Sequence, residues 1–180
     1  MMEGVVFRDV WKSFGEHYAL RGVSFHVDRG EVVGLLGPNV SGKSTLFGMT
    51  IGVLAPDSGE VLVGGVDPSK DPISARKMVG YMPEEPVLFE SLKVEEFLEF
   101  VLSVYGVNVN GEQVLKVLGM LGIEGEAGKL VGELSHGNKR RVLLAALMLR
   151  DPPVLVLDEV FAGLDPVSYT HLTLPTTERV

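Results

Sequence analysis

The chain has 180 residues and a formal net charge of -8 at pH 7, from 16 Lys and Arg residues against 24 Asp and Glu residues. A hydrophobic fraction of 46% excludes a disordered chain, and the lack of Cys excludes disulfide scaffolds, thiolate zinc sites and cysteine nucleophiles. A pI of about 5.0 argues against a sequence-independent grip on nucleic-acid phosphates. Since no long apolar run or signal-peptide layout occurs, we expect one cytosolic globular unit.

The N-terminal half is rich in predicted strands. Residues 5–10 and 23–27 alternate apolar and polar side chains, as the strands of an antiparallel edge do. The apolar run 31–36 predicts a short buried strand, and a Gly-rich segment then leads into a predicted helix over 43–51. Two further short strands are predicted between Gly and Pro residues, at 61–63 and 78–81.

The second half changes to helical spacing. Apolar residues recur at i, i+3 and i+4, and Asp151 with the two prolines after it ends the last helix. The predicted helices cover about 94–105, 111–121 and 135–150. The apolar run 154–157 then predicts a fully buried strand that ends in Asp158 and Glu159.

The Gly-rich segment between the predicted strand 31–36 and the predicted helix over 43–51 fits G-x-x-x-x-G-K-[ST], a phosphate-binding loop. Its backbone N–H groups and the helix N-terminus form an anion cradle, Lys43 adds a charge for the β- and γ-phosphates, and Ser44 can ligate Mg²⁺. Val40 is irregular, because a β-branched residue is costly wherever φ must be positive. The predicted nucleotide-binding residues here are Gly37, Pro38, Asn39, Val40, Ser41, Gly42, Lys43, Ser44 and Thr45.

Two further motifs follow this loop: Leu-Ser-His-Gly-Asn at 134–138 and the apolar run that ends in Asp158 and Glu159. In this order the motifs make the chain resemble the ATP-binding subunit of ABC transporters over about residues 2–166. The resemblance is strongest to exporter-type subunits, whose core reads Gly-Tyr-Met-Pro-Glu-Glu-Pro as at 80–86. It implies an α/β P-loop NTPase fold with an antiparallel β subdomain, a parallel-sheet core and a helical subdomain over about 85–150.

The resemblance also implies contacts to the nucleotide outside the loop. Phe14 matches the aromatic residue that stacks on adenine, which suits the flat face of a purine. Ser135 and Gly137 match the signature motif, which caps the γ-phosphate of nucleotide bound on the opposite subunit, with Ser135 as a helix N-cap. His136 replaces the more usual Gly and is given no chemistry. The basic run 139–141 is interpreted as a solvated helix face.

The catalytic and metal-binding residues are likewise carried over by the resemblance. Glu159 would polarise the hydrolytic water, with Lys43 and Glu84 as the other catalytic residues. Glu84 stands where the family usually has Gln and keeps an oxygen ligand. Ser44, Glu84 and Asp158 would bind Mg²⁺.

The implied function is an ATP-binding and ATP-hydrolysing subunit that powers an ABC exporter, with ATP and Mg²⁺ as cofactors. Its partners would be a second ABC ATPase subunit, in a homo- or heterodimer, and a transmembrane permease, with no nucleic acid. It would lie in the cytoplasm, peripheral on the inner face of the cell membrane. Two alternatives stay open: a soluble ABC ATPase on ribosomes or DNA, and a nucleotide-binding pseudo-ATPase, which Val40, Val160 and Phe161 motivate.

The C-terminal segment 167–180 resembles the translation of a transposon-type sequencing adapter and is excluded from the fold as non-native. We therefore expect a domain over 1–166 that is truncated after the loop ending at Asp165. The family's strand between 31–36 and 154–157 would then be missing, leaving unpaired backbone groups on both. We expect such a chain to bind ATP poorly and to hydrolyse hardly any.

Overall fold

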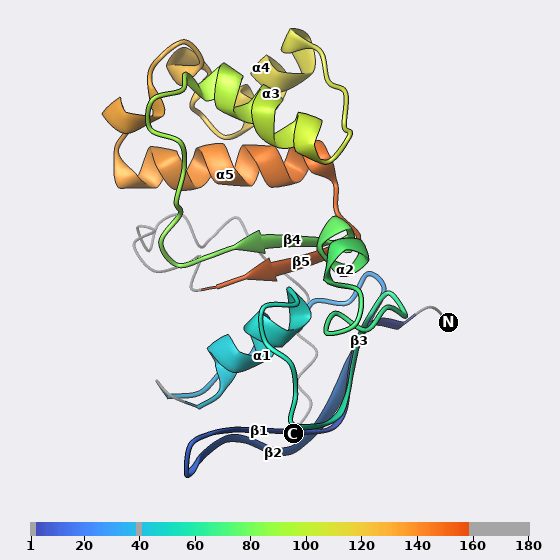
Figure 1. Ribbon diagram of the computed structural model, residues 1–180. Coiled ribbons are helices and arrows are strands. Elements are labelled where there is room, and N and C mark those ends of the chain that lie inside the picture. The colour runs from blue at the N-terminus through green and yellow to red at the C-terminus, as the bar shows by residue number, and fades with distance from the viewer. Residues whose placement is uncertain (1–2, 39–40, 159–180) are drawn as a thin grey trace. The chain divides into compact units, whose positions relative to one another are not determined.

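The computed structural model describes residues 3–38 and 41–158 of the chain. These residues form two compact units that divide between Val79 and Gly80. Figure 1 shows the strands β1 to β3 with α1 and α2 in the first unit, and the helices α3 to α5 with β5 in the second. Within the described ranges, no helix is long and apolar enough to cross a membrane.

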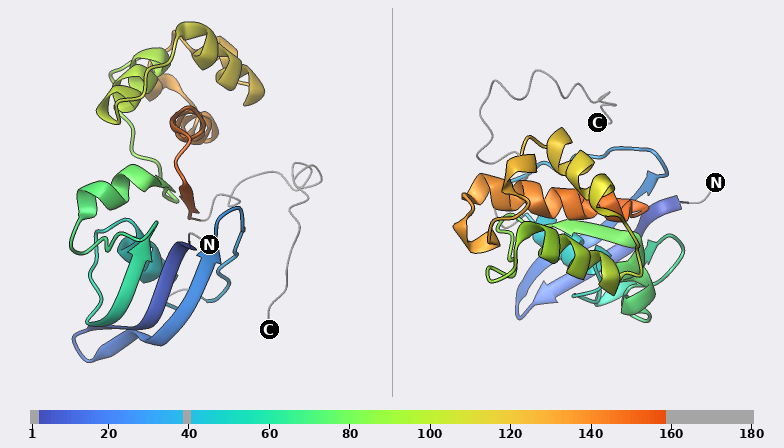
Figure 2. Two further views of the ribbon diagram at one scale, coloured as in Figure 1. Left: turned by 90° about the vertical axis from the view of Figure 1, so that its right-hand side faces the viewer. Right: turned by 90° about the horizontal axis from the view of Figure 1, so that it is seen from above.

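The first unit is built on an antiparallel sheet of three strands in the order β2-β1-β3. The strands are β1 (Glu3–Phe14), β2 (His17–Asp28) and β3 (Ser58–Val63), and they lie side by side in the left view of Figure 2. Val5 of β1 pairs with Val27 on one side and Val63 on the other. The pairing of the three strands confirms the predicted antiparallel edge and the predicted strand at 61–63, although burial in β1 does not alternate strictly, since Val5, Val6 and Phe7 are all buried.

Two helices complete the first unit. The helix α1 (Lys43–Thr50) lies next to β3 and confirms the helix predicted over 43–51. The helix α2 (Pro72–Met78) was not predicted, although Asp71 caps it by accepting from the Ser74 N–H at 3.1 Å, with Pro72 in its first turn. Arg76 of α2 donates to the backbone oxygen atoms of Ile51 and Gly52, just after α1.

The strand predicted at 31–36 is wrong. These residues form no regular structure, and Leu36 is 98% exposed. A parallel strand needs a neighbour for its N–H and C=O groups, and the described residues offer no strand that pairs with this segment. The apolar composition of 31–36 is therefore not sufficient to bury it.

The second unit packs three helices around one apolar core. The helices α3 (Val94–Val104), α4 (Gly111–Met120) and α5 (His136–Arg150) confirm the three predicted helices, and two short 3₁₀ helices join α4 to α5, η1 (Glu124–Glu126) and η2 (Val131–Glu133). Their buried faces meet through side chains such as Leu98, Leu118 and Val142. Ser135 caps α5, and Asp151 ends it with a left-handed φ of 49°.

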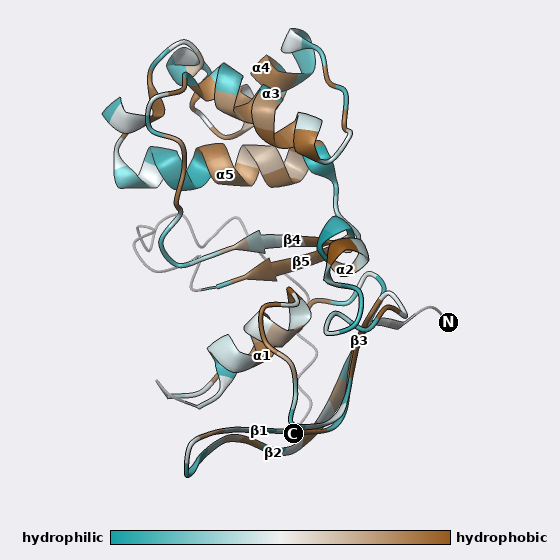
Figure 3. Cartoon of the chain, in the orientation of Figure 1, coloured by the Kyte–Doolittle hydropathy of each residue, from teal (hydrophilic) through white to brown (hydrophobic). Residues whose placement is uncertain are grey.

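The helices of this unit are accompanied by the strand pair β4 (Val79–Met82) and β5 (Val154–Leu157). Both arrows point the same way in Figure 1, as in a parallel pair. The prediction that β5 is fully buried is wrong, because Leu155 is 53% exposed and only Val156 is buried. The cause is that β4 is the one neighbour of β5 among the described strands, although β5 is apolar along its length (Figure 3).

Candidate functional site

The phosphate loop enters α1 through a glycine that no other residue replaces easily. Gly42 has a φ of +93° and N-caps α1. A Cβ atom at Gly42 would lie 2.7 Å from the backbone oxygen of Ala19 and 2.8 Å from the Leu20 side chain. Because both neighbours belong to β2, the start of α1 rests directly on the β1–β2 hairpin.

The Lys43 side chain folds back into the loop that precedes it. Its Nζ donates to the backbone oxygen atoms of Gly37 at 2.7 Å and Pro38 at 2.9 Å, and to the Ser41 hydroxyl at 3.4 Å. No acidic residue lies in the first turn of α1. The ammonium group and the helix N-terminus thus concentrate positive charge at one loop, which is the chemistry that a phosphate chain requires.

The remaining loop positions are only partly described. Ser44 is exposed and Thr45 is buried on α1. Asn39 and Val40 lie outside the described residues, so the predicted irregularity at Val40 stays a prediction. A Cβ atom at Gly37 would lie 2.7 Å from the Ser41 Oγ, which would have to move to make room for it.

Phe14 lies at the end of β1, in the same unit as the phosphate loop. It pairs with His17 across the hairpin, and its side chain is 51% exposed. The Nζ of Lys12 lies 5.6 Å from the centroid of the Phe14 ring. The hairpin that carries this ring also supports Gly42, so one element positions both the predicted base-stacking residue and the loop.

In the second unit, β4 and β5 bring two predicted metal-site residues to the same end of a strand pair. The Asp158 N–H donates to the Met82 backbone oxygen at 2.9 Å, and the Tyr81 hydroxyl donates to Asp158 Oδ2 at 3.4 Å. Glu84 follows two residues after β4 and is exposed. Burial and the Asp158 charge raise the pKa of Tyr81, so the phenol stays protonated. Ligands bind at such carboxyl ends of parallel strands.

The donor set fits a magnesium ion bound with a nucleotide better than a metal caged by protein. Within the part of the chain that is described, no group of three or more His, Cys, Asp or Glu side chains could hold a metal. Mg²⁺ commonly takes one or two carboxylates and fills its shell with waters and phosphate oxygens. Asp158 and Glu84 are carboxylates of that kind, while Glu159 lies outside the described residues.

The signature motif forms the N-terminus of α5. The Ser135 Oγ accepts from the Asn138 N–H at 3.3 Å, which confirms its N-cap role. Ser135, His136 and Gly137 are exposed, and a Cβ atom at Gly137 would meet nothing within 4 Å. This helix end is therefore open to contact from outside the unit.

The basic run after the signature motif is the predicted solvated face only in part, since Arg141 is exposed but Lys139 and Arg140 are half-buried. Lys139 Nζ lies 2.5 Å from Glu90 Oε1, and Arg140 donates to the Glu84 backbone oxygen at 2.6 Å. The hydrogen bond from Lys139 lowers the pKa of Glu90. These contacts join the start of α5 to the segment after β4. Residues so far apart in the chain give no local sequence signal of their pairing.

The predicted site residues are divided between the units. Phe14 and the described loop residues belong to the first, whereas Glu84, Ser135, Gly137 and Asp158 belong to the second. Sequence reasoning missed Tyr81, beside Asp158, and Asp57, which binds the residues before Phe14. The only signal for Tyr81 was its place in the 80–86 motif.

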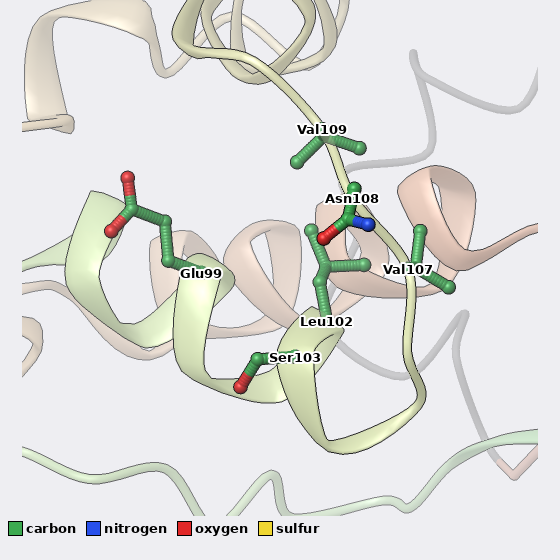
Figure 4. Close-up of a pocket in the computed structure, with 6 residues that line it drawn as sticks. All are labelled: Glu99, Leu102, Ser103, Val107, Asn108 and Val109. Carbon is green, nitrogen blue, oxygen red and sulfur yellow. The ribbon is translucent and has the colours of Figure 1, made fainter.

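A surface hollow in the second unit is unrelated to these residues. It has a volume of about 170 Å³ and lies between the end of α3 and the segment that leads to α4 (Figure 4). Its lining residues are Glu99, Leu102, Ser103, Val107, Asn108 and Val109. None of them is a predicted site residue, so the candidate site is not this hollow.

Comparison with known proteins gives one consistent family. Residues 20–162 match the ABC transporter family. The chain is 41% identical over 177 residues to Protein TRIGALACTOSYLDIACYLGLYCEROL 3, chloroplastic, of Arabidopsis thaliana, covering 91% of this chain and 51% of that protein. It is 39% identical over 175 residues to the Probable multidrug ABC transporter ATP-binding protein YbhF of Escherichia coli (strain K12), covering 96% of this chain and 30% of that protein.

A solved structure agrees with these relatives. The structure described as the ATP binding subunit of an ABC transporter superposes with a TM-score of 0.82 at 31% identity, covering 92% of this chain and 70% of that chain. The chain spans about half of the length of the Arabidopsis thaliana relative and less than a third of the length of the Escherichia coli relative. With a phosphate loop opening α1, a signature serine capping α5 and an aspartate ending β5, the chain belongs to the family of ABC transporter ATP-binding domains.

Proposed function

We propose that this protein binds and hydrolyses ATP as the energy-supplying subunit of an ABC exporter. The observation that carries the proposal is the phosphate loop, where the Lys43 ammonium and the N-terminus of α1 meet. The multidrug name of the Escherichia coli relative supports an exporter over the soluble alternative.

Each nucleotide contact uses the chemistry of the group that makes it. Lys43 and the first N–H groups of α1 bind the β- and γ-phosphates, and Phe14 stacks on adenine. Asp158, Glu84 and Ser44 would hold Mg²⁺, which would supply positive charge against the charge that develops on the transferred phosphoryl group. The Tyr81 hydroxyl, which donates to Asp158 Oδ2, would help to hold this carboxylate in place for the metal or its waters.

Water attack on the γ-phosphate is assigned to the two glutamates. Glu159 accepts the proton of the water or orients it, and Glu84 holds the water from the end of β4. Catalysis of this kind depends on positioning and charge, because little covalent chemistry falls to the protein.

The exposed N-terminus of α5 supports pairing with a second ATPase subunit. Ser135 and Gly137 face outward, where they would cap the γ-phosphate of nucleotide held by a second ATPase subunit. A transmembrane permease would bind this pair of subunits and hold them at the inner face of the cell membrane. Co-purification with a multi-spanning protein encoded beside this gene is expected. A neighbourhood without such a gene would favour the soluble ATPase instead.

The test of nucleotide binding compares two lysines of the same unit. Binding of a fluorescent ATP analogue with Mg²⁺ is measured for the unsubstituted chain, for Lys43→Ala and for Lys70→Ala, whose side chain is exposed and paired with Asp67. We expect weak binding that Lys43→Ala reduces by roughly 30-fold, the loss of one charged hydrogen-bonding group. Lys70→Ala should bind as the unsubstituted chain does.

Equal binding by all three proteins would contradict the proposed role of the loop. Phosphate release with Glu159→Gln as comparison separates an ATPase from a nucleotide-binding pseudo-enzyme. Measurable release that Glu159→Gln removes supports the ATPase and contradicts the pseudo-enzyme.

A further inference from the structure

Asp57 makes four hydrogen bonds to the three residues that precede Phe14. Its N–H donates to the Trp11 backbone oxygen at 2.9 Å. Its carboxylate accepts from Lys12 Nζ at 2.7 Å, and from the N–H and hydroxyl of Ser13 at 2.7 Å and 2.8 Å. Asp57 lies just before β3, so a residue distant in the chain holds the end of β1 in place.

These contacts fix the position of the Lys12 ammonium as well as the backbone at the end of β1. The hydrogen bond from Lys12, followed by those from Ser13, lowers the pKa of Asp57 to about 2, so the carboxylate stays ionised near neutral pH. The Lys12 side chain is only 17% exposed. Its ammonium therefore has a defined position, 5.6 Å from the centroid of the Phe14 ring.

We infer that Asp57 is a positioning residue for purine stacking: it holds Ser13 and Lys12 so that the Phe14 ring has a cation on one face and exposed surface for a base. The inference rests on the proposed function, in which Phe14 stacks on adenine. It adds a residue that none of the sequence motifs includes.

Two physical effects connect Asp57 to the affinity for a base. An exposed aromatic side chain held in one position loses less conformational entropy when a ligand orders it. The face of an aromatic ring is also electrostatically negative, and a fixed cation near it offsets repulsion by a second stacked ring. Both effects concern the base, so Asp57 should not alter the binding of a bare phosphate chain.

The same unit supplies a matched control. Asp67 accepts from the Ser69 N–H at 2.9 Å and hydroxyl at 2.6 Å, and pairs with Lys70 at 2.8 Å. Burial opposes its ionisation, but hydrogen bonds from Lys70 and Ser69 lower the pKa of Asp67 to about 2. Replacing Asp67 removes a carboxylate clamp of the same kind away from the residues that hold Phe14.

The experiment compares affinity for ATP with affinity for inorganic tripolyphosphate, which has no base. Both are measured by equilibrium competition on the full chain, and the ratio reports the contribution of the base. Phe14→Ala should lower the ratio roughly tenfold, as expected for one stacked base. Asp57→Ala should lower it about fourfold with tripolyphosphate affinity unchanged, since it disorders the ring without removing it.

Two comparisons make the test specific. Asp67→Ala should leave the ratio as it is, and Asp57→Ala should have no further effect in the Phe14→Ala background. Asp57→Asn keeps an acceptor for Ser13 but loses the charge that holds Lys12, so it should give an intermediate ratio.

The inference is overturned if Asp57→Ala and Asp67→Ala change the ratio equally, or if Asp57→Ala still acts without Phe14. It also falls if Phe14→Ala leaves the ratio unchanged, because then no base stacks there. Failure of the proposed function would give a different result, because the unsubstituted chain would then bind neither ATP nor tripolyphosphate. The positioning role of Asp57 would fall with it.

Discussion

Two apolar runs lead into the nucleotide motifs, and only one of them forms a strand. Residues 154–157 form β5, which pairs with β4 and is followed directly by Asp158. Residues 31–36 are similarly apolar and lead to Gly37, yet they form no strand and Leu36 is almost fully exposed. Hydrophobicity alone therefore does not make a strand, because the N–H and C=O groups of a strand need a neighbouring strand.

The two motifs are consequently held in different ways. Asp158 is fixed through the strand pair, by the Met82 backbone oxygen and the Tyr81 hydroxyl. The phosphate loop instead depends on the contact of Gly42 with β2 and on the bonds of Lys43 to the loop. Gly42 and Lys43 can thus keep their places at the start of α1 without a strand before the loop.

The largest effect on stability is expected where the loop meets β2. Gly42→Ala places a Cβ atom against Ala19 and Leu20 at a positive φ, and should lower the free energy of unfolding by about 3 kcal/mol. Gly34→Ala is the control, since a Cβ atom there meets nothing within 4 Å. Urea denaturation of both variants measures the contrast, and equal losses would show that 31–38 is packed after all.

A smaller effect on the free energy of unfolding is expected from one substitution in each apolar run, 154–157 and 31–36. Val156 is buried in β5, so Val156→Ala should cost about 1–2 kcal/mol of unfolding free energy through lost burial and a cavity. Leu36→Ala removes a larger side chain from an exposed position and should change it by less than about 0.5 kcal/mol. A Leu36→Ala loss as large as that of Val156→Ala would mean that Leu36 is buried in solution.

The smallest effect is on pH dependence and concerns the first unit alone. Asp57 and Asp67 each have a pKa of about 2, below the ordinary 3.8, so the unfolded chain binds more protons than the folded one in acid. Their stabilisation is present above the unfolded pKa and is lost as the pH falls toward 2. The free energy of unfolding, measured by denaturation between about pH 6 and pH 2, should therefore fall less steeply for the Asp57→Asn, Asp67→Asn double variant than for the unsubstituted chain. Identical acid profiles would count against both clamps.

Much of the fold could be predicted because its signals are local. The alternation in β1 and β2 and the helical spacing in α3 and α4 depend on residues a few positions apart. The phosphate loop is predictable for the same reason, as a short motif at the start of a helix, whereas the signature serine comes from the resemblance to the family.

The features that could not be predicted depend on contacts between residues far apart in the chain. The state of 31–36 depends on whether a strand lies beside it, and no local pattern reports that. Asp57 acts on the end of β1 from across the sheet, and Lys139 and Arg140 reach the segment after β4. The helix α2 is the exception, since its signal is local: Asp71 as N-cap and Pro72 in the first turn.

Hydrogen exchange of the full chain, read by mass spectrometry with and without Mg-ATP, tests two claims: that 154–157 forms a strand while 31–36 does not, and that the phosphate loop binds ATP. Without nucleotide, we expect amides of 155–157 to be protected and those of 32–36 to exchange at the rate of an unstructured chain. With Mg-ATP, exchange should slow at 41–46, where Lys43 and the start of α1 bind phosphate. Equal protection of the two apolar runs, or no change at 41–46 under saturating Mg-ATP, would contradict this description of the protein.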